Sequence, residues 1–259
     1  MASQLQVPDN AGLKLDVDGP VATVTLNRPE RRNAMSPSMW HGLAAIGDAL
    51  PEATRVVIIR GEGPSFSAGI DLRLFTGGLP GEKLASPADP GFEAAVASYQ
   101  AGYLWLRRPD IVSIAAVHGY AIGGGFQLAL ACDLRVCADD AIFCMKEPAL
   151  GLVPDLTGTK PLVDIVGVSR ALEICLTARN IGAAEAYTLG LAELVVPAAE
   201  LDGAVAELAQ ALQRPAADTA QATKELLLGA SGRTLEAQSA AEIAVQARLQ
   251  RSRGADSSW

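Results

Sequence analysis

The chain has 259 residues, of which 49% are hydrophobic, and its formal net charge is -8. This length and composition allow one large domain with a substantial core. The negative balance, without any long basic run, argues against nucleic-acid binding, which depends on a concentrated positive face.

The first part of the chain predicts strands and helices in turn. Two strands of alternating polarity are separated by Asp18-Gly19-Pro20, which indicates a hairpin. Ser36 and Pro37 suit the N-cap and the first position of the next helix. Residues 79–90, rich in Gly, Pro and Ser, predict a loop that helps to shape a ligand pocket. The expected strands are residues 13–17, 21–26 and 55–60, and the expected helices are residues 36–50 and 92–106.

An uncharged stretch over residues 111–132 follows. Its length would permit a membrane span, but its interior predicts a buried strand that ends at His118-Gly119. Each of the three glycines at 123–125 would cost a helix interior about 1 kcal/mol relative to Ala, so they belong outside a helix or in its first turn. A helix that begins near Gln127 would therefore present bare backbone N–H groups at its positive end, as an anion or oxyanion site does.

The remainder of the chain is mostly helical. We expect a mixed α/β core over residues 1–195 and a helical region over residues 196–259. The expected strands are residues 134–138, 141–145 and 192–196, and the expected helices are residues 161–166, 169–177, 183–189, 201–213, 217–228 and 236–251.

Cysteine and histidine are scarce. The cysteines at 132, 137, 144 and 175 lie in apolar surroundings without CxxC spacing, which favours free thiols in a reducing cytoplasm over disulfides or a zinc site. Two histidines supply little for metal or triad chemistry. Residues 1–10 lack the basic and apolar segments of a secretory signal, so we expect a cytoplasmic protein without a membrane anchor.

Two glycine-containing turns remain after the familiar motifs are set aside. No GxGxxG, GxxxxGK[ST] or nucleophile-elbow pattern fits, which disfavours dinucleotide, P-loop and serine-hydrolase chemistry. The remaining turns are residues 67–71 (SAGID) and 123–125 (GGG). Each alone is more simply a tight turn than a binding site.

Two carboxylates near the end of the predicted core are candidate proton carriers. Glu147 lies in an apolar stretch, and burial would raise its pKa until it could shuttle protons near neutral pH. It could instead pair with a structural arginine or cap a backbone group. Asp155 is a candidate acid or a cap of the next helix, whereas Asp71 fits an N-cap and His118 a core histidine with satisfied hydrogen bonds.

Taken in order, these segments resemble the crotonase (enoyl-CoA hydratase/isomerase) superfamily over residues 13–228. The combination of SAGID with HGYAIGGG is highly specific for that superfamily, although neither motif alone would be. The matching segments are LNRPERRNAMS, GPSFSAGIDL, AAVHGYAIGGGFQLALACDLRVCADDAIF and EPALGLVPDLTG.

The resemblance implies an α/β fold and an assembly. The expected fold is a crotonase-like spiral of ββα repeats that form two nearly perpendicular sheets. C-terminal helices, here residues 196–259, would serve trimer assembly, giving a homotrimer or a dimer of trimers. No membrane or nucleic-acid partner is expected.

The resemblance also assigns a site. Backbone N–H groups of Ile70 and Gly124 would form an oxyanion hole for the thioester oxygen of an acyl-CoA. The segment with Arg31, Arg32 and Ala34, together with Ala68, matches where the family binds CoA. Coenzyme A would enter only as part of the substrate, and neither a metal nor a redox cofactor is expected.

Two positions that depart from the family pattern indicate which of the family's reactions to expect. Family hydratases carry glutamates at the positions of Gln127 and Glu147, so an amide at the first position should impair hydration. An acid at Asp155, where hydratases usually carry glycine, is similar to the dienoyl-CoA isomerase branch, although that branch usually has an acid at position 127 as well. We therefore expect a double-bond isomerase in which Glu147 is the principal acid and base, Asp155 a second proton carrier and Gln127 a polar support.

Three alternatives stay open. A 2-enoyl-CoA hydratase of fatty-acid β-oxidation is the first, and a non-catalytic acyl-CoA-binding protein is the second. A haloaryl-CoA dehalogenase would use Asp155 as a nucleophile, but that branch usually has tryptophan at position 147. The C-terminus (residues 248–259) also lacks the usual aromatic and basic helix that reaches a neighbouring subunit's CoA.

Overall fold

A six-stranded sheet organises the chain in this computed structural model, which describes residues 11–256. Strands β1 (Leu13–Asp18) and β2 (Val21–Leu26) form the expected antiparallel hairpin. All later neighbours in the order β1-β2-β3-β4-β6-β9 pair in parallel. These later strands are β3 (Val56–Gly61), β4 (Val112–Val117), β6 (Leu134–Ala138) and β9 (Leu194–Val196).

A smaller sheet of three short strands carries the second glycine turn. It has the order β5-β7-β8, with β5 (Tyr120–Ile122), β7 (Ile142–Cys144) and β8 (Ile181–Gly182). The strand expected at 141–145 is β7, whereas β5 and β8 were not predicted. Segments of two or three residues are too short to show an alternating pattern.

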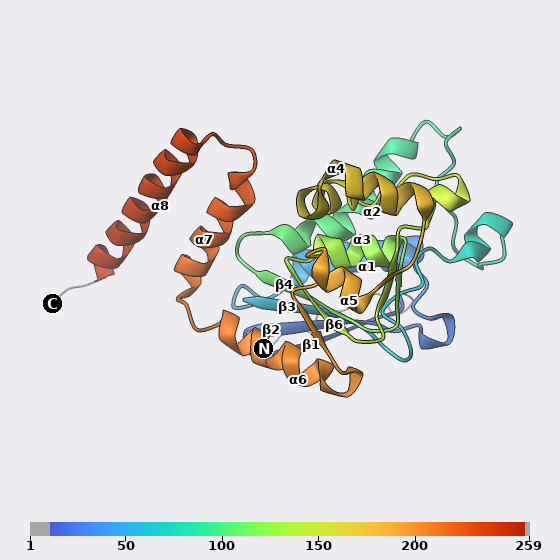
Figure 1. Ribbon diagram of the computed structural model, residues 1–259, viewed down its shortest axis with the longest axis horizontal. Coiled ribbons are helices and arrows are strands. Elements are labelled where there is room, and N and C mark those ends of the chain that lie inside the picture. Colours follow the sequence, from blue (N-terminus) through green and yellow to red (C-terminus); the bar gives the residue numbers. More distant parts are fainter. Residues whose placement is uncertain (1–10, 257–259) are drawn as a thin grey trace.

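Helices cover both faces of the large sheet. Successive residues of a strand point to opposite faces, so neighbouring residues pack against different helices. Val57 and Ala115 pack into the main core, whereas Val56 and Ile114 pack against helix α6 (Leu201–Leu212). Figure 1 shows α6 beneath the sheet and the other core helices above it. These other helices are α1 (Pro37–Ala49), α2 (Phe92–Leu104), α3 (Gly124–Ala131), α4 (Thr159–Thr177) and α5 (Ala183–Thr188).

Helix boundaries lie within three residues of the expected ones, with two exceptions: one merger, and the last helix, which was expected to end at residue 251 but extends to Asp256. The helices expected at 161–166 and 169–177 form the single element α4, which is interrupted at Gly167 with φ 74° and ψ 164°. Short 3-10 helices extend or connect the elements: η1 (Pro29–Arg31), η2 (Leu72–Thr76), η3 (Trp105–Arg107), η4 (Glu147–Leu150) and η5 (Ala198–Glu200). No helix in the part of the chain that the structure describes is both long and apolar enough to cross a membrane.

Helices α7 (Ala217–Ala230) and α8 (Leu235–Asp256) project from one side of the body (Figure 1). Lys224 anchors α7, since its Nζ donates to Asp133 Oδ2 at 2.6 Å and to the carbonyl of Ile111 at 2.7 Å. The first α-helix of the region expected over residues 196–259 is α6, and it belongs to the core because it packs against the large sheet. Only α7 and α8 stand apart, and their role in assembly stays a prediction.

Candidate functional site

The two glycine turns meet at the N-terminus of α3. Ser67 pairs with β5, because its N–H donates to the Tyr120 carbonyl at 2.8 Å and its carbonyl accepts from Ile122 N–H at 2.9 Å. Gly69 has φ +80°, and a Cβ there would lie 2.5 Å from the Ile122 carbonyl oxygen and 3.5 Å from the Gly124 nitrogen. Only glycine fits this close approach. The turns expected to act together are therefore adjacent.

The N–H groups of Ile70 and Gly124 are both available at this junction. Met35 pairs with the residues on either side of Ile70: its N–H donates to the Gly69 carbonyl and its carbonyl accepts from Asp71 N–H, both at 2.8 Å. In parallel pairing of this kind the N–H of the middle residue, here Ile70, points away from the paired strand and so away from Met35. Gly124 is the first residue of α3, where no intrahelical acceptor exists. Within residues 11–256, neither N–H has a hydrogen-bond acceptor.

Glu147 is buried beside this junction, with 8% of its surface exposed. Its Oε1 lies 3.0 Å from the position that a Cβ on Gly123 would take. Burial is the main reason why the pKa of Glu147 is raised. No arginine pairs with it in the described chain; its Oε1 accepts from Gln127 Nε2 at 2.6 Å, and its Oε2 is buried without a partner. The prediction of a buried, pKa-raised acid is confirmed, and the structural arginine pair is not formed.

Gln127 is locked in one orientation. Its Oε1 accepts the backbone N–H groups of Leu156 and Gly158 at 2.9 and 3.1 Å. A Cβ on Gly158 would lie 2.5 Å from Gln127 Cγ, so glycine at 158 makes room for this side chain. Because the amide oxygen must face these two donors, the amide nitrogen must face Glu147.

Asp155 lies close enough for its charge to contribute to the raised pKa of Glu147. The residue is exposed in this chain, yet the protein atoms around its carboxyl raise its own pKa, mainly by removing water. Its carbonyl accepts from Gln100 Nε2 of α2 at 2.6 Å. The N-cap of α4 is Gly158, so the alternative reading of Asp155 as a helix cap is wrong.

The segment expected to bind CoA leads directly into Met35, which pairs beside Ile70. Arg31 and Arg32 are exposed, whereas Ala34 is buried. The N–H of Ala68 donates to the Arg32 carbonyl at 2.8 Å, which joins the two predicted parts of the CoA site. The Arg32 guanidinium lies 5.5 Å from the ring centroid of Tyr120.

Asp71 is the N-cap of η2, as expected, and also joins two arginines. Its carboxylate accepts from Arg73 N–H at 3.2 Å, from Arg73 Nη2 at 2.6 Å and from Arg28 Nη2 at 3.1 Å. These bonds, those from Arg73 first, hold the pKa of Asp71 far below its usual range. Arg28 also donates to the Ala34 carbonyl. Arg28 was not among the predicted site residues, and its place within LNRPERRNAMS is the only feature of the sequence that points to it.

Tyr103 was also missed. It is buried in α2, and its hydroxyl donates to the Gly124 carbonyl at 3.2 Å and lies 3.4 Å from Met35 Sδ. Burial, with smaller contributions from Glu147 and Asp155, raises its pKa. It therefore stays protonated and supports the junction as a donor. His118 is half-buried and hydrogen-bonded to the Gly63 carbonyl at 2.8 Å, so it is satisfied but is not a core residue.

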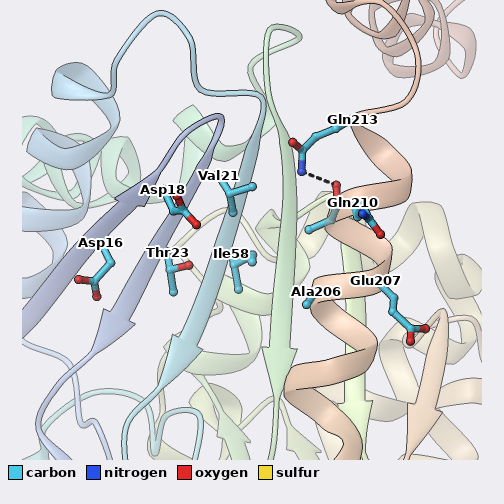
Figure 2. Close-up of a pocket in the computed structure, with 10 residues that line it drawn as sticks. Asp16, Asp18, Val21, Thr23, Ile58, Ala206, Glu207, Gln210 and Gln213 are labelled. Carbon is cyan, nitrogen blue, oxygen red and sulfur yellow. Dashed lines mark hydrogen bonds between the residues drawn. The ribbon is translucent and has the colours of Figure 1, made fainter.

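A separate groove lies across the large sheet, between β1–β3 and α6 (Figure 2). Its volume is about 530 Å³, and it is lined by Asp16, Thr23 and Ile58 of the strands and by Glu207 of α6. None of the candidate site residues lines this groove.

The two sheets, the apposed glycine turns and the surrounding helices define the crotonase class of fold. A family model described as enoyl-CoA hydratase/isomerase matches residues 16–257. The structure is similar to a protein of Thermobifida fusca YX that bears the name of an enoyl-CoA hydratase and was solved in complex with CoA. That likeness has 56% sequence identity and a TM-score of 0.91, over 97% of this chain and 100% of the other.

Curated relatives have differing activities. A peroxisomal Delta(3,5)-Delta(2,4)-dienoyl-CoA isomerase of Arabidopsis thaliana is 33% identical over 83% of this chain and 80% of its own length. A hydroxycinnamoyl-CoA hydratase-lyase of Pseudomonas fluorescens is 33% identical over 77% of this chain and 72% of its own length. The chain belongs to the enoyl-CoA hydratase/isomerase family, which confirms the resemblance seen in the sequence.

Proposed function

We propose that the protein shifts a double bond in an enoyl- or dienoyl-CoA thioester. The observation that carries the proposal is the environment of Glu147. One of its oxygens is held by Gln127, and the other is buried with no partner among the described residues, beside two N–H groups that lack acceptors there. An acid of raised pKa next to an oxyanion site suits removal of a proton adjacent to a carbonyl.

The reaction on a 3-enoyl thioester balances with one carboxylate. Glu147 takes a proton from C2, and the electron pair moves into a dienolate whose oxygen accepts from Ile70 and Gly124 N–H. The protonated Glu147, whose proton can exchange with solvent, then donates a proton to C4, the double bond comes to lie between C2 and C3, and Glu147 is again ionised. One oxyanion-hole donor typically contributes about 3–4 kcal/mol to transition-state stabilisation.

A dienoyl substrate would use a second acid. Protonation at the far end of a longer dienolate needs a group beyond the reach of Glu147. Asp155 fits this need, because its carboxyl is near Glu147 and has a raised pKa. The dienoyl-CoA isomerase among the relatives supports this extension.

Hydration is the second candidate, and the hydratase-lyase among the relatives favours it. A water that adds to a double bond must be held and deprotonated. The acceptor of Gln127 is already used by two backbone N–H groups, and an amide cannot take a proton. We therefore expect water addition to be slow relative to isomerisation.

The proposal includes the binding partner and the assembly. A CoA thioester would lie along Arg31, Ala34 and Ala68, and the existence of a CoA complex of a related protein supports CoA binding as such. We propose no metal or redox cofactor, a cytoplasmic location, and a homotrimer or a dimer of trimers through residues 196–259.

Product analysis tests this function. Incubation with a 3-enoyl-CoA and, separately, with a 2-enoyl-CoA should give 2-enoyl product in the first case and little 3-hydroxyacyl product in the second. Glu147→Gln should abolish both. Rapid hydration of the 2-enoyl-CoA would favour the hydratase, and tight binding without turnover would favour an acyl-CoA carrier.

A further inference from the structure

Residues 77–91 form the irregular segment between η2 and α2, two elements that carry contacts of the candidate site. The preceding η2 begins directly after Asp71. The following α2 carries Gln100, which donates to the Asp155 carbonyl, and Tyr103, which donates to the Gly124 carbonyl. The segment therefore connects η2, which follows Asp71, to the helix that contacts both Asp155 and the oxyanion junction.

Glu82 ties the middle of this segment to the start of α1. Its Oε1 accepts from Ser36 Oγ at 2.9 Å and also from Ser38 Oγ, and its Oε2 accepts from Ser38 N–H at 3.2 Å. Two residues further on, Leu84 packs against the main core. One charged and one apolar contact thus hold the segment down.

The contact replaces an ordinary helix cap. Ser36 occupies the N-cap position of α1, but its side chain makes no capping hydrogen bond, and Pro37 has no N–H. The carboxylate of Glu82, 44 positions later in the chain, accepts the Ser38 N–H instead. A negative charge is favourable at this positive end of a helix.

The same helix start is joined to the oxyanion junction. Ser36 follows Met35, whose backbone pairs on both sides of Ile70 and whose sulfur lies beside the Tyr103 hydroxyl. Glu82 therefore fixes the 77–91 segment to the chain segment that positions the thioester oxygen. Within residues 11–256 its carboxylate makes its hydrogen bonds to the start of α1, so it is not part of the proton-transfer machinery.

We propose that Glu82 is a specificity-determining positioning residue: it holds residues 77–91 over the acyl end of the site and thereby limits acyl-chain length. This inference rests on the proposed acyl-CoA function. Loss of the carboxylate frees the segment and lets longer acyl chains bind, without changing the contacts to CoA.

The test compares Glu82→Ala with Lys83→Ala, a change at an exposed neighbour in the same segment. Hydrogen–deuterium exchange of the ligand-free protein and calorimetric dissociation constants for free CoA and for saturated acyl-CoAs of increasing length are measured. In Glu82→Ala, exchange in residues 77–91 should rise at least about tenfold. The long-chain to short-chain affinity ratio should also rise about tenfold, while free-CoA affinity stays within about twofold. Ser38→Ala should shift the ratio in the same direction, and Lys83→Ala should shift neither measurement.

Two results would overturn the inference. Unchanged exchange in Glu82→Ala would show that the carboxylate does not hold the segment, whatever the protein binds. Raised exchange with an unchanged length preference would remove its role in specificity. Both measurements are independent of turnover, so a failure of the proposed isomerase reaction would be seen separately, as an absence of product.

Discussion

Replacement of Gln127 by methionine removes one donor and one acceptor from the centre of the candidate site. The donor is the amide N–H that bonds Glu147 Oε1 at 2.6 Å, and the acceptor is the oxygen that receives Leu156 and Gly158 N–H. Methionine keeps an unbranched side chain in the space that glycine at 158 leaves open.

Two magnitudes follow. A hydrogen bond to a charged group contributes about 1.5–3 kcal/mol, and one pKa unit corresponds to about 1.4 kcal/mol. The pKa of Glu147, already raised by burial, should therefore rise further, because the bond that favours its ionised form is lost. Two buried N–H groups lose their acceptor at about 1–3 kcal/mol each, so the free energy of unfolding should fall by about 2–6 kcal/mol.

The assay is the pH dependence of kcat/KM for isomerisation. Glu147 must be ionised to accept the C2 proton, so activity falls as the pH drops below its pKa. In Gln127→Met this acid limb should move to higher pH, because loss of the amide N–H disfavours the ionised form of Glu147. Gln100→Met is the matched control, because the Gln100 amide bonds a backbone carbonyl and should leave the limb in place.

An acid limb that stays in place in Gln127→Met would refute the reasoning, provided that the variant is folded. It would mean either that the amide does not hold the base or that Glu147 is not the group that titrates. Urea unfolding of the same variant measures the stability change independently.

Three further predictions concern stability and the oxyanion junction. The pKa of Glu147 is near 4.5 in the unfolded protein and higher in the folded protein. The free energy of unfolding should therefore fall as the pH rises through that interval. Urea unfolding of Glu147→Gln should not show this fall. Gly69→Ala places a Cβ 2.5 Å from the Ile122 carbonyl at φ +80° and should displace the Ile70 N–H, so kcat should drop by about 10²–10³ while CoA still binds; an unchanged kcat would remove Ile70 from the site. Lys224→Met breaks a largely buried ion pair and should lower the free energy of unfolding by about 3–5 kcal/mol, with increased hydrogen exchange in α7; equal stability would show that α7 is held by other contacts.

Local patterns in the sequence predicted most of the elements. The alternation in β1 and β2, the apolar run of β4 and the proline at the start of α1 each depend on nearby residues, and their boundaries differ from prediction by one residue at most. The strands β5 and β8 form because the chain around them brings partners within reach, so their few residues hold no pattern of their own.

The sequence predicted most residues of the candidate site but not how their side chains contact one another. Burial of Glu147 followed from its apolar neighbours. The bond from Gln127 joins residues 20 positions apart, and the contact between Glu82 and Ser38 spans 44. Such contacts depend on how elements pack, which residue types alone do not specify. Asp155 was equally consistent with a cap and with a proton carrier, and the position of the first residues of α4 removed the cap.

Deuterium exchange tests the central claim most directly. The protein is incubated in D₂O with a 3-enoyl-CoA and with a dienoyl-CoA, beside Glu147→Gln and Asp155→Asn, and mass spectrometry locates the deuterium. We predict that Glu147→Gln loses exchange at C2 and that Asp155→Asn loses only exchange at the remote carbon. Bound substrate without any exchange in the unaltered protein would contradict enolate formation at this site.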